Sequence, residues 1–400
     1  MRGGTSRALF FHVADLPPDP RERDRVLLAA LGSPDPYGRQ LDGLGGGISS
    51  LSKAVIVAPP SHPQADVDYT FAQVSVGDPL VDYKGNCGNC TSAVGPFAID
   101  ERLVSALEPL TTVRLFNTNT KKLVVARVPV AGSEAAVEGD FELQGVPGRG
   151  ARIALDFLDP GGAVTGRLLP TGRPRDTLDV PGVGAIEASL VDATNPVVFV
   201  RAKDLGLLGT DSPEAVDRDA ALLSRLEAIR LAGAALMRIP GSPAIPKVAF
   251  VAPPASYRSL DGREIAVRDV DLVARVISMG KCHRAFALTA AMCLAVAARL
   301  AGTVVRESLS PPRGEGQGEG ADLRLGHPSG ILPIAALLDD NDDIKACHDL
   351  LGLDFGIAVV TDIGVLGIVG PVPFGILLNV GLIRGISIDV LIAVAVHIGI

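Results

Sequence analysis

The stretch from Lys84 to Asp100 constrains the fold of this chain most, because a tight glycine turn there joins a predicted strand to a predicted helix. Residues 66–76 before it alternate apolar and polar side chains, which is the pattern of a strand. Residues 93–104 after it are small and apolar, which predicts a short buried helix. The turn between them, residues 86–89, reads Asn-Cys-Gly-Asn. Unpaired N–H groups at such a helix start favour a bound carboxylate and lower the pKa of a thiol, although an ordinary Asn/Gly turn with a buried cysteine fits the spacing equally well.

A second stretch, residues 278–292, has the same order of parts: a strand, a glycine turn, polar residues and an apolar helix that runs to Leu300. Ser278, Lys281 and His283 are expected at the start of this helix, where the charged form of a histidine is disfavoured. An N-cap serine beside two solvated bases is the simpler alternative. The architecture is therefore predicted to be duplicated, although the sequence itself is not visibly repeated.

Composition limits the class of protein. The 400 residues include 45 Gly and 30 Pro, which indicates many turns and many short strands, and the length predicts two domains. A net charge of −8 without a basic run argues against a nucleic-acid partner. Five cysteines do not make a disulfide framework, and residues 1–6 lack the apolar core of a signal peptide, so a cytoplasmic enzyme is expected.

Cys87 and Cys90 form a C-x-x-C motif. Because no second pair and no nearby histidine accompany it, no zinc site is expected. A thioredoxin-like redox pair stays open on spacing alone, although no βαβ pattern surrounds it.

Two glycine-rich loops can bring backbone close to an anionic ligand. Residues 2–6 read Arg-Gly-Gly-Thr-Ser, which is also what a flexible chain start contains. Residues 41–52, rich in Gly and Ser, lead to Lys53 at the entrance of a predicted strand. Lys53 is either a solvated edge residue or an acid/base whose pKa is lowered by burial.

The remaining pattern predicts helices and strands along two domains. The expected helices span residues 20–31 and 215–237, and the expected strands span residues 8–13, 54–58, 111–117, 122–129, 153–157, 185–192, 196–202 and 247–252. The first domain is expected over residues 1–150 and the second over residues 151–330, with a flexible loop at 308–322.

Residues 331–400 change in character and are expected to be an atypical apolar tail outside the native fold. An acidic cluster at 339–343 is followed by residues 363–383, which carry no charge. That length could cross a bilayer, but Pro371, Pro373 and several glycines interrupt it, so both a membrane segment and an unusual tail stay open.

These motifs together resemble the PrpF family, the 2-methylaconitate cis–trans isomerases and their relatives that act on methylitaconate and 4-oxalomesaconate. The matching segments are residues 1–6, 32–35, 42–46, 52–53, 86–89, 93–99, 169–172, 278–281, 283 and 326–330. The resemblance therefore covers residues 1 to about 330. Cys90 stands where the family has an ordinary apolar residue, which makes the C-x-x-C incidental. The strands and Arg-rich ending of the family are not recognisable after Gly330, which is what a shifted reading frame or a fused segment would produce and which puts stability and activity in doubt.

The resemblance implies a diaminopimelate-epimerase-like α+β fold, in which two similar domains each wrap a β-barrel-like sheet around a central helix. The active site would lie in the cleft, where both helix N-termini point. The implied activity is isomerisation of a small unsaturated di- or tricarboxylate such as 2-methylaconitate, by proton transfer and without metal or organic cofactor. No membrane partner is expected, and a homodimer is left open.

The resemblance also assigns site residues. Lys53 is the first candidate for the acid/base, and Cys87 is the second catalytic candidate. The implied substrate-binding residues are Arg2, Thr5, Ser6, Asn86, Gly88, Asn89, Ser278, Lys281, His283, His327 and Ser329.

Three alternatives remain. An amino-acid racemase or epimerase of the same fold would need two opposed thiols, and Cys282 is the residue near the second helix start that could supply the other. A non-catalytic accessory protein for a dehydratase is the second alternative. A membrane-anchored or degenerate product is the third.

Overall fold

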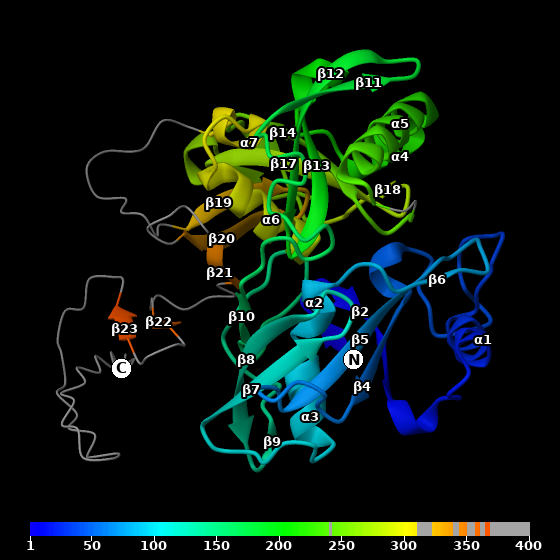
Figure 1. Ribbon diagram of the computed structural model, residues 1–400, viewed down its shortest axis with the longest axis vertical. Helices are drawn as coiled ribbons and strands as arrows, with labels where there is room; N and C mark the ends of the chain where they lie inside the picture. The colour runs from blue at the N-terminus through cyan, green and yellow to red at the C-terminus, as the bar shows by residue number, and fades with distance from the viewer. Residues whose placement is uncertain (240–241, 310–321, 339–343, 350–356, 361–364, 369–400) are drawn as a thin grey trace. The chain divides into compact units, whose positions relative to one another are not determined.

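The computed structural model describes residues 1–239, 242–309, 322–338, 344–349, 357–360 and 365–368 (Figure 1). The chain divides into two compact units, Met1–Gly352 and Leu353–Ile400. In the second unit, β22 (Ile357–Val360) and β23 (Val365–Ile368) pair with each other antiparallel. All other elements belong to the first unit, which is described below.

The first half of this unit is a curved sheet with one helix on its outer side and one inside it (Figure 1). Its strands are β3 (Leu9–His12), β4 (Lys53–Ala58), β5 (Val67–Val74), β6 (Val81–Asp82), β7 (Leu110–Asn117), β8 (Lys122–Ala131), β9 (Glu134–Ala135) and β10 (Ala154–Leu158). β3 runs parallel to β4, β4 antiparallel to β5, and β5 parallel to β7. β7 and β8, which correspond to the strands predicted at 111–117 and 122–129, form an antiparallel hairpin, and β8 pairs with β10.

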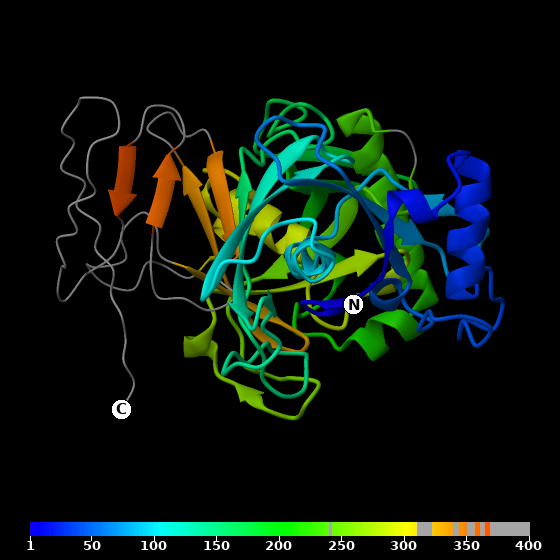
Figure 2. The ribbon, with the colours of Figure 1, turned by 90° about the horizontal axis from the view of Figure 1, so that it is seen from below.

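The helices of this half are α1 (Pro20–Leu31), α2 (Gly88–Thr91) and α3 (Val94–Asp100). α1 begins and ends where the sequence predicts, because Asp19 accepts hydrogen bonds from the first turn and Gly32 takes the left-handed conformation at φ 72°. α3 is buried from Val94 to Ile99 and packs on β7, β8 and β9. Figure 2 shows this cyan helix nearly end-on, with the strands of the first half curving round it.

The second half repeats this plan. Its strands are β11 (Asp176–Val180), β12 (Gly184–Ala193), β13 (Asn195–Arg201), β14 (Lys247–Ala252), β17 (Leu272–Ser278), β18 (Lys281–Cys282), β19 (Leu323–His327) and β20 (Gly330–Leu338). β13 runs parallel to β14, β14 antiparallel to β17, β17 parallel to β19, and β19 antiparallel to β20. The pairings of β13, β14, β17, β19 and β20 thus repeat those of β3, β4, β5, β7 and β8, which confirms the predicted duplication of architecture.

The helices of the second half are α4 (Pro213–Arg218), α5 (Ala220–Met237), α6 (Leu288–Arg299) and α7 (Val304–Glu307). The single helix predicted over 215–237 is two helices, because the side chain of Asp219 caps α5 by accepting from the N–H of Leu222 at 2.9 Å. α6 is the buried counterpart of α3, with every residue from Leu288 to Ala298 buried. The prediction that this helix begins near Ser278 is wrong, since β17 and β18 form a hairpin there and α6 begins ten residues later.

Short elements complete the unit. They are β1 (Arg2–Gly3), β2 (Ser6–Arg7), β15 (Tyr257–Arg258), β16 (Glu264–Ile265) and the 3-10 turns Val13–Asp15, Ser49–Leu51, Ala202–Leu205 and Val267–Asp269.

The strand β21 (Ile344–Asp349) joins the two halves. It pairs with β20 of the second half and with β10 of the first half, both antiparallel. β10 lies after the expected boundary at residue 150 and yet belongs to the first sheet. The prediction that residues 331–400 lie outside the native fold is wrong for β20 and β21, which are ladder strands of the main sheet.

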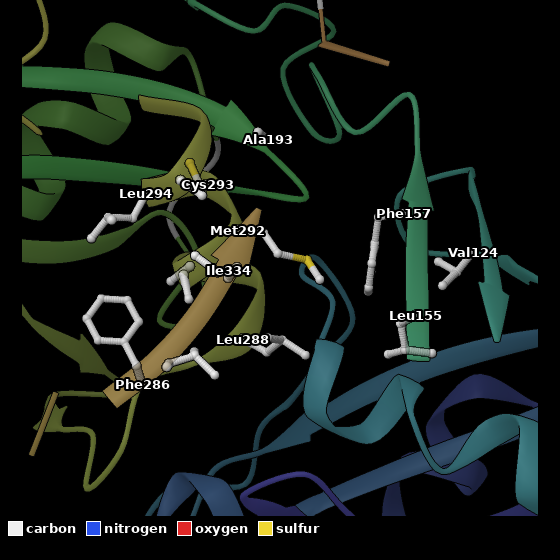
Figure 3. Close-up of a cluster of buried hydrophobic side chains, with 14 of the residues drawn as sticks. Val124, Leu155, Phe157, Ala193, Phe286, Leu288, Met292, Cys293, Leu294 and Ile334 are labelled. Carbon is white, nitrogen blue, oxygen red and sulfur yellow. The ribbon is translucent and has the colours of Figure 1, made fainter. Parts of the chain in front are cut away.

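The physical reason is visible on β20, where Leu332, Ile334 and Ala336 alternate inward and are buried. Figure 3 shows Ile334 beside Met292 and Leu288 of α6, in the same cluster as Leu155 and Phe157 of β10. One core cluster therefore includes side chains of both halves. A second cluster lies between α4, α5 and their sheet, and a third lies under α1.

The predicted loop at 308–322 and the uncharged segment at 363–383 lie almost wholly outside the described residues. In the part of the chain that the structure describes, no helix has the length and apolar character needed to cross a membrane.

Candidate active site

Side chains from both halves line one small pocket, whose cavity volume of about 20 Å³ holds about one water molecule. The first half contributes Ser6, Lys53, Phe71, Gln73, Gly85, Asn86, Cys87 and Asn89. The second half contributes Asn195, Ala244, Ile245, Lys247, Ser278, His283, Ala287, Leu288 and Thr289. The stretches 86–89 and 278–283 therefore face the same pocket, as the sequence predicts, although about 190 residues of chain separate them.

The buried helices of both halves begin at this pocket. Cys87 is the N-cap residue of α2 and Ala287 is the N-cap residue of α6. The two helix starts touch, because a Cβ on Gly88 would lie 3.1 Å from the side chain of Leu288. This close approach explains why the first turn of α2 begins with glycine.

Asn195 ties the two helix starts together. Its side-chain oxygen accepts from the N–H of Asn86 at 3.0 Å, and its amide nitrogen donates to the carbonyl of Asn86 at 2.6 Å. The same amide nitrogen donates to the hydroxyl of Thr289 at 2.8 Å. The Asn-Cys-Gly-Asn turn is thus held by a residue of the second half, in a buried network with its hydrogen bonds satisfied.

The N-terminal motif folds as a hairpin of β1 and β2 against Asn89. A Cβ on Gly3 would lie 2.0 Å from the Asn89 carbonyl oxygen, and one on Gly4 would lie 2.1 Å from its side-chain oxygen. The N–H of Thr5 donates to that side-chain oxygen at 3.2 Å, and Ser6 follows in the pocket wall. The two glycines are therefore needed for the close approach that places Ser6.

Lys53 is the first residue of β4, and its side chain is buried in the pocket. Its ammonium donates to the side-chain oxygen of Gln73, the residue opposite it on β5, and lies 5.1 Å from the ring centroid of Phe71. The amide nitrogen of Gln73 donates to the carbonyls of Ser49 and Ser52, which fixes the amide oxygen toward Lys53. Lys53 is therefore held in place and is not a solvated edge residue.

Cys87 is half-buried, and its sulfur lies 3.9 Å from the hydroxyl of Ser6. A hydrogen bond from the Cys90 thiol, assisted by the positive charge of Lys53, lowers the pKa of Cys87. Burial raises the pKa of Cys90. The two thiols of the C-x-x-C thus influence each other, with the lowered pKa at Cys87 and the raised pKa at Cys90.

Lys247 is a buried pocket lysine that the sequence reasoning missed. It is the first residue of β14, as Lys53 is of β4, and its ammonium nitrogen lies 3.1 Å from the carbonyl of Ala244 and 3.3 Å from the hydroxyl of Ser278. Burial, assisted by the charge of Lys53, lowers the pKa of Lys247 to about 8. The signal was present in the sequence, because Lys-Ala-Val-Ile-Val-Ala at 53–58 resembles Lys-Val-Ala-Phe-Val-Ala at 247–252.

His283 lies buried in the pocket wall, five residues before the start of α6. Its Nδ1 accepts from the N–H of Ala285 at 3.1 Å, which assigns the proton of the neutral ring to Nε2. Burial, with the charges of Lys53 and Lys247, lowers the pKa of His283 to about 3. A neutral hydrogen-bond donor is therefore available on this side of the pocket.

Six of the predicted site residues do not line the pocket. Arg2 and Lys281 are exposed, and the Arg2 guanidinium turns back to the carbonyl of Gly4. Thr5 and Gly88 support the pocket through the backbone contacts described above. His327 and Ser329 are buried outside the pocket lining, where the N–H of Ser329 donates to the His327 ring at 3.2 Å and the hydroxyl of Ser329 donates to the carbonyl of Arg284 at 2.8 Å. Lys281 misses the helix start because it belongs to the β17–β18 hairpin.

Among the described residues, no group of three or more His, Cys, Asp or Glu side chains is placed to hold a metal ion. The pocket instead gathers two lysines, an activated thiol, a neutral histidine and several amides and hydroxyls. Such a set can hold an anion and exchange protons with it. Two similar α+β halves that meet at a pocket of this kind suit an enzyme that transfers protons on an anionic substrate.

Comparison with known proteins identifies the family of this chain. Residues 1–348 match the family model described as PrpF protein, and the chain belongs to this family. The 3-methylitaconate isomerase of Eubacterium barkeri is 44% identical over 355 residues, which are 86% of this chain and 91% of that protein. The 2-methyl-aconitate isomerase of Shewanella oneidensis is 42% identical over 355 residues, with 84% and 88% covered. A crystal structure of methylitaconate-delta-isomerase is 43% identical, covers 87% of this chain and 90% of its own, and superposes with a TM-score of 0.69.

The predicted family, the α+β fold of two similar halves and the isomerase class are therefore confirmed. The match also extends past Gly330, the expected end of the resemblance, and includes β20 and nearly all of β21.

Proposed function

We propose that this chain isomerises a small unsaturated di- or tricarboxylate by moving a proton within an allylic system. The observation that carries this proposal is the pair Lys53 and Lys247 beside Cys87 in one pocket built from both halves. The names of the similar proteins, which are isomerases of 3-methylitaconate and 2-methylaconitate, support the substrate class.

Binding of the carboxylates is the first task of the pocket. Ammonium groups attract carboxylates and donate charge-assisted hydrogen bonds to them. The side chains of Ser6 and Asn89 and the neutral ring of His283 add uncharged donors on either side. The N-terminus of α6, at Ala287 and Leu288, adds unpaired N–H groups and the positive end of the helix dipole.

Proton transfer is the second task. Removing a proton next to an alkene that bears a carboxylate leaves an allylic anion, whose charge spreads into the carboxylate. Positive charge and fixed donors around that carboxylate stabilise the anion more than the substrate, which lowers the barrier. Lys53 is the residue we assign to acid/base work, because a buried, positioned amine can give a proton to the anion and take one back. Cys87 is the second candidate.

A substrate panel tests the proposal. The purified chain is incubated separately with 2-methylaconitate, 3-methylitaconate, trans-aconitate and 4-oxalomesaconate, and the products are identified by proton NMR. We expect isomerisation of at least one compound, which Lys53→Ala abolishes and Lys203→Ala, a change at an exposed lysine, leaves intact. A folded wild-type protein that converts none of the four would refute the proposal and favour an accessory role instead.

A further inference from the structure

We propose that Lys247 is the base that removes the substrate proton, and that Lys53 is the acid that returns a proton at the other end of the allylic system. This inference rests on the proposed function. It adds a catalytic residue from the second half of the chain.

The duplicated fold places the two lysines at corresponding points. Lys53 is the first residue of β4 and pairs with Gln73 on β5. Lys247 is the first residue of β14, and one step along the ladder from the Val248–Ile277 pair brings it opposite Ser278 on β17. Each lysine contacts the polar side chain opposite it, and each lines the pocket. The site therefore has one amine from each half.

The contacts of the two amines differ. Lys53 meets a fixed amide oxygen and the face of an aromatic ring, and both contacts stabilise an ammonium ion. Lys247 has two acceptors, the carbonyl of Ala244 and the hydroxyl of Ser278. A neutral amine has two N–H groups and one lone pair, so these two acceptors satisfy both N–H groups and leave the lone pair free for a substrate proton.

The charges around Lys247 act in the same direction as its burial. The positive charges of Lys53 and Arg230 oppose a charge on Lys247, whereas Cys87 and Asp82 favour one. His283, which also faces the pocket, is held neutral by its burial. Burial is the largest of these effects and lowers the pKa of Lys247 to about 8. A useful fraction of the amine is then neutral at mildly alkaline pH, as a general base requires.

The proposed reaction transfers two protons in sequence. A C–H bond of the substrate breaks, its proton forms an N–H bond on neutral Lys247, and its electron pair enters the allylic system. A proton from the ammonium of Lys53 then forms a C–H bond at the far carbon, and the double bond shifts. One proton has passed from Lys53 to Lys247, and exchange with water restores both groups before the next turnover.

A merely electrostatic role for Lys247, binding a substrate carboxylate, is the competing explanation. The two roles separate in Lys247→Arg, because arginine keeps the positive charge but does not lose a proton at these pH values. Lys247→Met removes both the charge and the base at similar volume. Lys203→Met, at an exposed lysine, is the matched control.

The experiment measures kcat and KM for each variant on the substrate that the wild type converts, together with the melting temperature of each. We expect Lys247→Arg and Lys247→Met to lose about 10²-fold or more in kcat, as loss of a general base does, with KM in Lys247→Arg close to wild type. We also expect kcat/KM of the wild type to rise with pH up to about 8, and this rise to be absent in Lys247→Arg. Lys203→Met should match the wild type.

Near-wild-type kcat in Lys247→Arg, with a raised KM in Lys247→Met, would overturn the inference in favour of carboxylate binding. Should the wild type convert no substrate, the proposed function itself fails. In that case ¹³C NMR of the lysine Cε signals still tests whether the amine of Lys247 is poised to act as a base. One signal titrating near pH 8 that disappears in Lys247→Arg supports a poised base, and its absence overturns the inference.

Discussion

Cys87 and Ala287 occupy the same position in the two halves of the chain, since each is the N-cap of a buried helix and each lines the pocket. A racemase of this fold would need a thiol at both positions. Cys282, the thiol expected near the second helix start, lies on β18, where it is buried and its pKa is raised by burial to about 12. Among the described residues that line the pocket, Cys87 is the one thiol, so the racemase alternative lacks its second acid/base.

Lys53 and Cys87, the lysine and the thiol of the first half, should contribute unequally to the rate of isomerisation. We expect Lys53→Ala to abolish isomerisation, with a loss of about 10³-fold or more, because it removes both an acid and a stabilising charge. We expect Cys87→Ala to lower kcat by only about tenfold, because the thiol assists a site that retains both amines. Steady-state kinetics of the two variants checks this. Equal, near-total losses would instead place the thiol directly in the proton transfer.

The thiol pair should control the reactivity of Cys87. Removing the Cys90 thiol in Cys90→Ala deletes the hydrogen bond that contributes most to lowering the pKa of Cys87. The thiolate fraction at pH 7 then falls, and alkylation of Cys87 by iodoacetamide, followed by mass spectrometry, should slow by about tenfold per unit of pKa above the assay pH. Cys90→Ser keeps a donor and should stay close to wild type. Unchanged alkylation in Cys90→Ala would show that the pair does not activate Cys87.

Buried histidines should make the fold acid-sensitive. Burial lowers the pKa of His327 to about 3, below the value of about 6.5 in an unfolded chain. The unfolded chain therefore binds more protons, so stability is full above pH 6.5 and falls as the pH drops from 6.5 toward 3. Between pH 6.5 and 5 this histidine alone should lower the free energy of unfolding by about 2 kcal/mol.

His327→Asn tests this, because asparagine does not titrate and can accept the hydrogen bond from the N–H of Ser329. Urea unfolding at pH 7 and at pH 5 should show a smaller loss of stability in the variant than in the wild type. An equal loss in both proteins would mean that His327 is not buried as a neutral ring. His283 contributes in the same direction, since its pKa is also lowered to about 3.

The end of the native fold can be tested by truncation. A chain that ends at Gly330 loses β20 and β21 and with them the buried side chains of Leu332, Ile334 and Ala336, so we expect it not to fold. A chain that ends at Gly352 keeps the whole first unit and should show a cooperative thermal transition by circular dichroism. Cooperative unfolding of the shorter chain would show that β20 and β21 are dispensable.

The parts of the fold that the sequence predicts correctly are those with local chemical signals. Asp19 and Gly32 mark the ends of α1, and the alternation around residues 118–121 marks the β7–β8 hairpin. The predicted start of α6 lies ten residues too early because Ser278, Gly280 and Lys281 belong to a β-turn whose residues also suit a helix start. β20 was missed because its buried face alternates with the half-buried Ile331 and Pro333, so the run looks uniformly apolar.

In the candidate site, too, the sequence predicts the residues that stand in local motifs and does not predict the others. Lys53, Cys87 and Asn89 stand in glycine-rich motifs, and the structure brings them to the pocket. Lys247 and Asn195 carry no such local signal, because their positions follow from strand pairings that join distant parts of the chain. Only the repeat of β4 in β14 could have pointed to Lys247, and that repeat becomes meaningful once the two sheets are known to correspond.

The central claim, that this pocket removes and returns a substrate proton, is tested most directly by solvent exchange. The wild-type chain and Lys53→Ala are incubated with 2-methylaconitate and 3-methylitaconate in D₂O, and deuterium in product and remaining substrate is followed by NMR. We predict that the wild type gives an isomerised product with deuterium at the newly formed C–H position, and that Lys53→Ala gives none. An isomerised product from the wild type without solvent deuterium, or isomerisation and exchange in Lys53→Ala at the wild-type rate, would contradict the claim.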